Sequence, residues 1–379
     1  MKYNRPLHLA RALLASLLLT ACLAKPVQIP APQADPVGEV TPLVMTNMKV
    51  RRAAHTATLL SNGQVLLTGG FQEDGKGHEL PITDAELYNP ETNTFIPTGA
   101  LNSARSGHTA TRLPDGQVLI VGGWGRANRT ANAELYDPAT GQFVPTGSLA
   151  AERAGMTATL LKNGKVLIAG GEQTSSKPLL VAEIYDPATH SFTATSALNG
   201  DRSGHTATLL QNGNVLLIGG KASGDGVLAS AELYDPATGV FTFTGNLHSV
   251  RHKHAAVGLQ DGNVLVVGGS DERDWQGKYA SAEIYNVAKG VFVQTAALNS
   301  ERFKLADAVV LLDNGNILIA GGHRQLELFD AQLQQFTPQQ PLQTAYYFAT
   351  STLLENGAVL IAGGYNGDIR VTDQAWIYH

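Results

Sequence analysis

A pair of glycines follows a short aliphatic run seven times in this chain of 379 residues. Successive pairs are 53, 48, 49, 49, 53 and 42 residues apart, at Gly69-Gly70, Gly122-Gly123, Gly170-Gly171, Gly219-Gly220, Gly268-Gly269, Gly321-Gly322 and Gly363-Gly364. A period near fifty residues indicates that each unit is one supersecondary block that must pack on its neighbours to bury its apolar face. Features present in every unit therefore belong to the scaffold, and specificity lies in what differs between units.

The second unit predicts four strands. Residues 105–113 and 117–121 flank Asp115-Gly116, a strong hairpin signal because both turn positions are expected to take positive φ. Residues 133–137 alternate like a strand and end at a proline turn, and residues 142–145 form a fourth strand. The hairpin pair recurs in the other six units, at Asn62-Gly63, Asn163-Gly164, Asn212-Gly213, Asp261-Gly262, Asn314-Gly315 and Asn356-Gly357. We predict a four-stranded antiparallel meander in each unit, with strands a to d.

Four-stranded sheets repeated around an axis form a β-propeller. Strand c carries an aromatic residue in each unit, at Tyr88, Tyr136, Tyr185, Tyr234, Tyr285, Phe329 and Tyr378, and strand d carries Phe95, Phe143, Phe192, Phe241, Phe292 and Phe336. With the glycine pairs, these residues make positions 38–379 resemble the Kelch repeats of galactose-oxidase-like propellers, with Phe where eukaryotic repeats usually have Trp. The resemblance is strongest to bacterial proteins of the lipoprotein type. It implies an all-β fold, a seven-bladed β-propeller of four-stranded antiparallel blades.

The two ends of the repeat region predict how the ring closes. The last unit stops at His379 within strand c, so its strand d is missing. Residues 39–44 precede the first Arg-x-x-His element at the spacing of a strand d. We therefore expect this N-terminal segment to complete the last blade. Pro42 takes the place of the usual Phe, which an edge strand tolerates.

The N-terminus has the pattern of an export signal. Lys2, Arg5 and Arg11 precede the apolar residues 12–19, a run too short to span a bilayer as a mature helix. Cys22, the only cysteine, ends a sequence that resembles the lipobox of bacterial lipoproteins, although a structural or redox cysteine is the alternative.

This resemblance implies a signal peptide at residues 1–21, acylation of Cys22 and attachment to a membrane. Residues 22–37 would form a proline-rich tether. Leu23 in place of Asp implies the outer membrane, with the propeller of residues 38–379 facing the periplasm or the surface. A net charge of -5 and the absence of Lys/Arg runs give no reason to expect nucleic acid as a partner. We expect a monomer.

An arginine recurs at the start of strand a, at Arg52, Arg105, Arg153, Arg202 and Arg251. These arginines could form a positive ring that binds carboxylates. Alternatively, they pair with a glutamate that recurs in strand c, at Glu86, Glu134, Glu183, Glu232, Glu283 and Glu327. The second interpretation is favoured because both sets repeat. His55, His108, His205 and His254 also occupy equivalent positions, which spread around a ring and so predict no metal site.

The later units depart from the repeat. In the sixth, counting back from the turn places Lys304 at the arginine position and Asp307 at the histidine position, whereas counting forward from Phe292 places Arg302 there. The seventh has Tyr346, and the fifth has His252 and Lys253. Exposed aromatic residues beside cations suit carbohydrate or peptide recognition, although such rings can also pack on their own blades. The candidate ligand-binding residues are Arg52, Arg105, Trp124, Arg126, Arg202, Arg251, Trp275, Lys304, Arg324, Tyr346 and Tyr365.

The residues predict a binding or assembly module that recognises a protein, peptide or carbohydrate on its loop-rich face, without catalysis, cofactor or metal. The copper radical oxidases of this scaffold need a cysteine crosslinked to tyrosine, and no cysteine follows Cys22. A periplasmic sugar mutarotase or epimerase, similar to the propellers that epimerise sialic acid, is the alternative. A purely structural spacer of the envelope is a third possibility.

Overall fold

The computed structural model describes residues 43–174 and 177–379. The predicted signal peptide, Cys22 and the tether lie outside the described residues, as does Pro42. The described strands belong to one compact unit, Val40–His379. No helix in this part of the chain is long and apolar enough to cross a membrane.

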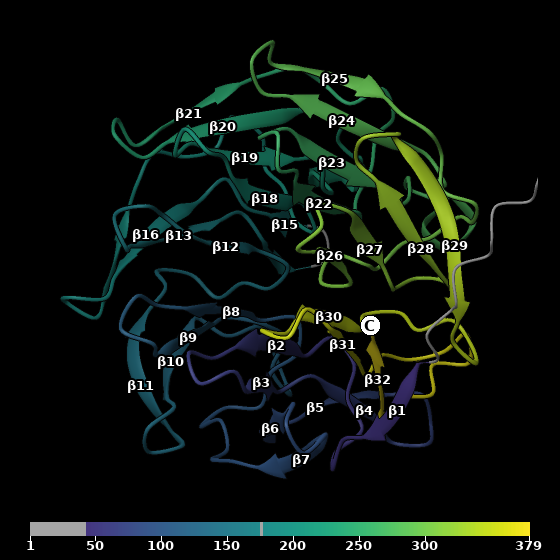
Figure 1. The fold of residues 1–379 in the computed structure, drawn as a ribbon. Coiled ribbons are helices and arrows are strands. Elements are labelled where there is room, and N and C mark those ends of the chain that lie inside the picture. The colour runs from purple at the N-terminus through teal and green to yellow at the C-terminus, as the bar shows by residue number, and fades with distance from the viewer. Residues whose placement is uncertain (1–42, 175–176) are drawn as a thin grey trace, which may run out of the picture. The chain divides into compact units, whose positions relative to one another are not determined.

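The described residues form seven four-stranded antiparallel sheets, the blades of a propeller (Figure 1). Blade 1 comprises β2 (Thr56–Leu59), β3 (Val65–Thr68), β6 (Ala85–Asn89) and β7 (Thr94–Pro97). Blade 2 comprises β8 (Thr109–Arg112), β9 (Val118–Val121), β10 (Asn132–Asp137) and β11 (Gln142–Ser148). Blade 3 comprises β12 (Thr157–Leu160), β13 (Val166–Ala169), β16 (Ala182–Asp186) and β17 (Ser191–Ala194). Blade 4 comprises β18 (Thr206–Leu209), β19 (Val215–Ile218), β20 (Ala231–Asp235) and β21 (Val240–Phe243). Blade 5 comprises β22 (Ala255–Gly258), β23 (Val264–Val267), β24 (Ala282–Asn286) and β25 (Val291–Gln294). Blade 6 comprises β26 (Val309–Leu311), β27 (Ile317–Ile319), β28 (Gln325–Asp330) and β29 (Gln335–Pro341).

Blade 7 is built from both ends of the described chain. It contains β30 (Thr350–Leu353), β31 (Val359–Ala362), β32 (Gln374–Tyr378) and β1 (Val44–Asn47). β1 pairs antiparallel with β32, from Val44 opposite Ile377 to Asn47 opposite Gln374. The predicted closure is confirmed, but the closing strand begins at Val44, the residue at which the predicted segment ends.

The first strand of each blade faces the centre of the ring and packs against the first strands of both neighbouring blades (Figure 1). The second strand of each blade is buried along its whole length. Behind it, the aromatic residues of strands c and d pack on each other, as in the pair Tyr136–Phe143 with ring centroids 4.8 Å apart. The recurrent aromatic residues therefore belong to the scaffold.

The hairpin between the first two strands has one geometry throughout, as blade 1 illustrates. The Leu60 N–H donates to Gln64 O (2.8 Å), and the Gly63 N–H donates to Leu60 O (3.1 Å). Gly63 has φ +78°, whereas Asn62 has no positive φ. The hairpins are confirmed, but the turn is a type I turn followed by one left-handed glycine rather than a turn with two positive φ values.

Short strands and 3-10 turns lie in the loops between the second and third strands of several blades. β4 (Phe71–Glu73) pairs with β5 (Glu79–Pro81), and β14 (Glu172–Thr174) pairs with β15 (Lys177–Pro178). Two 3-10 turns, η1 (Ser223–Asp225) and η2 (Asp274–Gln276), lie in the same loops of blades 4 and 5. These loops differ between blades and give the ring its asymmetry.

Candidate functional site at the mouth of the central channel

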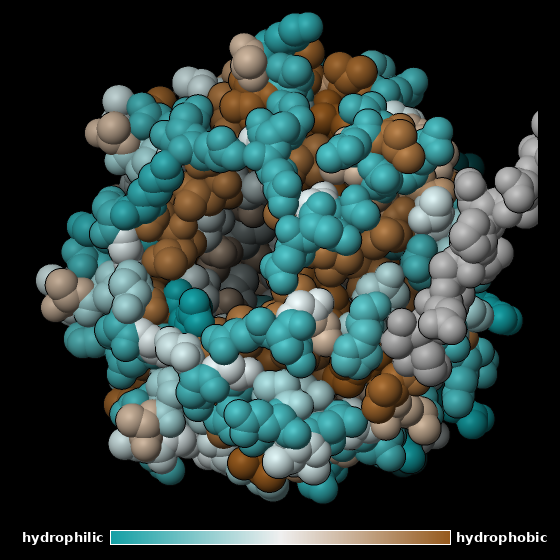
Figure 2. All heavy atoms as spheres, in the orientation of Figure 1, coloured by the Kyte–Doolittle hydropathy of each residue, from teal (hydrophilic) through white to brown (hydrophobic). Residues whose placement is uncertain are grey.

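A cavity of about 1420 Å³ occupies the centre of the ring and its mouth. Figure 2 shows the opening in the space-filling view. In every blade except the sixth, the segment that enters the first strand pairs with the loop after the second strand, as in the bridges Ser106–Trp124 and Tyr347–Tyr365. The two sets of connections therefore share one face, as predicted, and residues from both line the cavity.

One residue per blade forms what we call the ring position, two residues after the buried arginine of blades 1 to 6. Its occupants are Ala54, Gly107, Gly155, Gly204, Lys253, Lys304 and Phe348. Each has φ between +50° and +63°. The N–H at this position donates to the carbonyl of its counterpart in the preceding blade at six junctions, for example Lys304 N to Lys253 O at 2.9 Å. This chain of backbone bonds runs around the mouth, and its one interruption lies between Gly107 and Gly155.

The recurrent arginines lie beneath this ring and are fully buried. In blade 1, Arg52 Nη2 donates to Glu86 Oε1 at 2.7 Å, and Nη1 donates to two backbone carbonyls. The same carboxylate accepts the backbone N–H groups of Lys49 and Val50, so it fixes the connection that enters the blade. The guanidinium groups of Arg52, Arg105, Arg202 and Arg251 are thus enclosed and ion-paired, as the second interpretation of these residues expects, and none of them lines the cavity.

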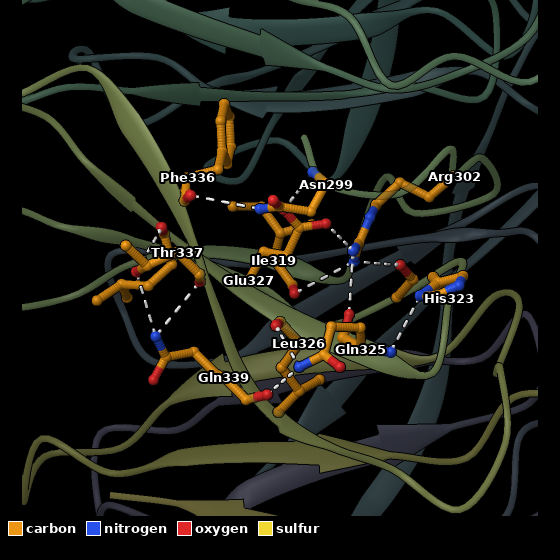
Figure 3. A network of polar contacts seen from close by, with 12 residues as sticks. Asn299, Arg302, Ile319, His323, Gln325, Leu326, Glu327, Phe336, Thr337 and Gln339 are labelled. Carbon is orange, nitrogen blue, oxygen red and sulfur yellow. Dashed lines mark hydrogen bonds and ion pairs between the residues drawn. The ribbon is translucent and has the colours of Figure 1, made fainter. Parts of the chain in front are cut away.

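Blade 6 resolves the ambiguity between Arg302 and Lys304. Arg302 is buried and pairs with Glu327, whose carboxylate also accepts from Asn299 (Figure 3). Lys304 occupies the ring position instead. Counting from the turn failed because a turn at Ala306 and Asp307 adds two residues before β26.

Blade 7 replaces the ion pair with aromatic packing. Tyr346 takes the place of the arginine and is 4% exposed. Its ring packs on Trp376 with centroids 4.8 Å apart, and its hydroxyl donates to Gln374 Oε1 at 2.7 Å. Trp376 stands opposite Ile361, the register that the pairing glutamate has in other blades. Tyr346 is therefore a core residue.

The recurrent histidines join neighbouring blades. His205 Nε2 lies 3.1 Å from Thr157 Oγ1 of the preceding blade, and His55 Nε2 lies 3.1 Å from Thr350 Oγ1. Burial lowers the pKa of His108 and His205 to about 3, so these rings are neutral. Among residues 43–174 and 177–379, no three His, Cys, Asp or Glu side chains are grouped as metal ligands.

Blades 5 to 7 place two lysines and several rings at the mouth. The Lys304 ammonium donates to Tyr365 Oη at 2.8 Å and lies 4.3 Å from the centre of the Trp275 ring. Lys253 instead pairs with Asp274 at 2.7 Å. Phe303 and Phe348 complete the aromatic surroundings of Lys304, with ring centroids 4.9 and 5.6 Å from Nζ. Three residues of this site, Lys253, Asp274 and Phe348, were not among the candidate ligand-binding residues predicted from the sequence.

Trp124 forms a separate wall of the mouth, over blades 2 and 3. A Cβ atom added to Gly107 would lie 2.0 Å from Trp124 Cζ3, so the indole rests directly on the ring position of blade 2. The ring glycine of blade 3, Gly155, also lies within contact distance. Trp124 stays 36% exposed and lines the cavity. Glycine at these two positions is therefore matched to a tryptophan that faces the channel.

Asp307 places a carboxyl group within the channel. The first strands otherwise present mainly small residues there, such as Ala57, Ala158 and Ala256. The Asp307 side chain is exposed to the channel yet surrounded by the blades, and this desolvation raises its pKa. Its backbone carbonyl accepts from the N–H of Ser351 at 2.7 Å.

The remaining candidates lie away from the cavity lining. Arg126 and Arg324 are exposed on their loops, and Trp275 reaches the site only through its packing on Lys304. The structure thus brings Lys304, Tyr365 and Trp124 to one cavity and leaves Arg126 and Arg324 outside it. Aligning the units on the buried arginine would have found the ring position, because Lys253, Lys304 and Phe348 replace Gly or Ala.

Comparison with known proteins agrees with the fold. Residues 104–149, essentially blade 2, match the Kelch motif. A stretch of 79 residues is 35% identical to tRNA wybutosine-synthesizing protein 4 of Saccharomyces cerevisiae, which is 21% of this chain and 11% of that protein. The chain therefore spans about a tenth of that relative. The described part of the chain is thus a seven-bladed propeller whose second blade matches the Kelch motif.

A fungal alcohol oxidase of the AA5 family, solved in complex with copper, has a similar structure. The TM-score is 0.72 at 19% identity, over 90% of this chain and 76% of the oxidase. The expectation that the protein is not an enzyme is contradicted by this structural neighbour, which is an alcohol oxidase. At this identity the likeness shows the fold alone.

Proposed function

We propose that the propeller binds a carbohydrate at the mouth of its central channel. The observation that carries the proposal is Trp124, an exposed indole seated on Gly107 at the wall of the cavity. Aromatic faces suit the apolar faces of sugar rings, and a pocket of this kind needs few polar groups to orient its ligand.

The opposite wall supplies those polar groups. The contacts between first strands place the blades around the ring in sequence order, so blades 5 and 6 lie across the channel from blades 2 and 3; they contribute Lys253, Asp274 and Lys304 to the lining. Glu79 from blade 1 is exposed in the same cavity. Carboxylates accept from sugar hydroxyls, and ammonium groups donate to them. This mixture of charges favours a polyhydroxylated ligand over a strongly anionic one.

Isothermal titration of the purified propeller against neutral and acidic sugars tests the proposal. We expect Trp124→Ala to weaken binding about fivefold, since aromatic packing contributes on the order of 1 kcal/mol. Arg126→Ala is the matched control, because Arg126 lies on the same loop but outside the lining. Binding that is unchanged in Trp124→Ala, or equally weakened in Arg126→Ala, would count against this site.

Sugar isomerisation is a second candidate function, favoured by Asp307. A carboxyl whose pKa is raised stays protonated to higher pH than an ordinary aspartate and can donate a proton to a sugar ring oxygen, and Lys304, whose pKa is lowered to about 8, can accept one. Ring opening and reclosure would then exchange anomers without a cofactor. Exchange spectroscopy by NMR with the wild type and Asp307→Asn tests it: equal exchange rates in both proteins would rule out this role for Asp307.

We further propose that the propeller acts at the cell envelope as a monomeric lipoprotein anchored through Cys22. The motif at residues 19–22 and the proline-rich segment after it support this placement. Metabolic labelling with a fatty acid should mark the wild type and spare Cys22→Ser. Equal labelling of both proteins would remove the basis for the anchor.

A further inference from the structure

Lys304 has an unusual environment for a lysine. The residue is 7% exposed, and its Nζ is surrounded by the rings of Trp275, Phe303, Phe348 and Tyr365. Among the described residues it makes no ion pair, and Tyr365 Oη is its hydrogen-bond partner. A buried ammonium without a close counter-ion is costly.

Lys253 provides a contrast within the same site. It occupies the ring position of the preceding blade, and its side chain is 29% exposed and bonded to Asp274. Asp274 is thus the ion-pair partner of Lys253. The repulsion between the two lysines disfavours the charged form of Lys304, as its burial does. Desolvation, followed by the charge of Lys253, lowers the pKa of Lys304 to about 8. Roughly a quarter of its amine is then neutral at pH 7.5, against roughly a thousandth for an ordinary lysine.

Tyr365 supplies a proton donor beside this amine. Burial raises the pKa of Tyr365 well above that of an exposed tyrosine, so its hydroxyl stays protonated across the physiological range. Lys304, Tyr365 and Phe348 all line the cavity, so a small molecule in the mouth reaches this group. The structure places a weakly basic amine, a phenol and apolar walls at one point of the channel mouth.

We propose that Lys304 is a nucleophilic amine that forms an imine with the aldehyde or ketone group of a ligand in the channel mouth. The neutral Nζ attacks the carbonyl carbon, and the carbonyl oxygen takes a proton, for which Tyr365 is the donor. The carbinolamine then loses that oxygen as water, and the C=N bond forms as Nζ gives up its protons. One water is released and no oxidant is needed. The proposal rests on the proposed ligand cavity but not on the identity of its natural ligand.

Reductive trapping tests the proposal on the whole propeller. The protein is incubated with glycolaldehyde and sodium cyanoborohydride, and the modified lysines are located by peptide mass spectrometry. At pH 7.5 we expect Lys304 to be labelled at least about tenfold faster than Lys253, with a rate that levels off above about pH 8. Tyr365→Phe should slow labelling of Lys304 without changing that of Lys253.

Two results would overturn the proposal: labelling of Lys304 no faster than that of Lys253, or a Lys304 rate that keeps rising towards pH 10. Circular dichroism of each variant checks that the propeller stays folded. Lys304→Arg serves as a second variant, since it keeps a positive charge and must abolish labelling at this position. Loss of trapping with intact, Trp124-dependent sugar binding refutes the imine alone, whereas trapping without sugar binding refutes only the proposed carbohydrate ligand.

Discussion

The buried Arg202–Glu232 pair of blade 4 allows a quantitative test of what the recurrent arginines do. Both side chains are 0% exposed, and their charged atoms are 2.7 Å apart. Replacing Glu232 by Gln keeps the size of the side chain but leaves the guanidinium without its counter-charge. Removing one partner of a buried pair costs about 3–5 kcal/mol, so we expect the free energy of unfolding to fall by that amount.

The matched control is Asp186→Asn, which breaks the exposed Lys165–Asp186 pair of blade 3. Its side chains are 44% and 25% exposed, so its loss should cost less than about 1 kcal/mol. Urea denaturation gives both values, and amide hydrogen exchange checks that the extra loss begins in β18–β21. If Glu232→Gln costs no more than Asp186→Asn, the arginine is not held by this carboxylate and the structural role assigned to it is wrong.

Three further predictions concern the channel and the closure of the ring. The pKa of Lys304 falls from 10.5 to about 8 on folding. The wild type should therefore gain stability relative to Lys304→Met as pH rises from about 8 to 10.5, by at most about 3 kcal/mol. A difference in unfolding free energy that stays constant over this pH range would contradict this. Folding raises the pKa of Asp307, so the wild type should lose stability relative to Asp307→Asn as pH rises from acid to neutral, and thermal denaturation at pH 3 and pH 7 measures the difference. Deletion of the chain through Asn47 removes β1, so hydrogen exchange in β30–β32 should become faster, and a peptide of residues 43–48 should restore protection. Unchanged exchange after the deletion would show that β1 is not needed to close the ring.

The fold could be predicted from sequence because its signals are local and repeated. The glycine pairs, the hairpin turns and the aromatic residues of strands c and d each recur in fixed order, and the ring follows from that repetition. The start of β1 was misplaced because Val44–Asn47 has no aromatic marker and little internal pattern. The turn type was misassigned because asparagine before glycine is compatible with two hairpin geometries.

The site was harder to predict because its contacts join residues from different blades. Trp124, Tyr365 and Lys304 were identified as departures from the repeat, but their surroundings come from side chains far away in the chain. Nothing local in the sequence indicates that Lys304 contacts Trp275 and Tyr365, or that Trp124 rests on Gly107. For the arginines, the sequence suggested a ligand-binding role that the structure does not support. A charged residue at the start of strand a was compatible both with ligand binding and with an ion pair in the core.

The ring position explains how a regular scaffold acquires one differentiated site. Its backbone is held by bonds between blades, so its conformation is the same whatever side chain it carries. Glycine adopts this left-handed conformation freely, whereas Lys253, Lys304, Phe348 and Ala54 do so at a cost of about 1–3 kcal/mol each. That cost falls on four consecutive blades of the ring, namely blades 5, 6, 7 and 1, and the side chains of blades 5 to 7 surround the Lys304 amine. Replacing Lys304 by Gly should relieve the strain in blade 6 while removing the proposed reactive amine.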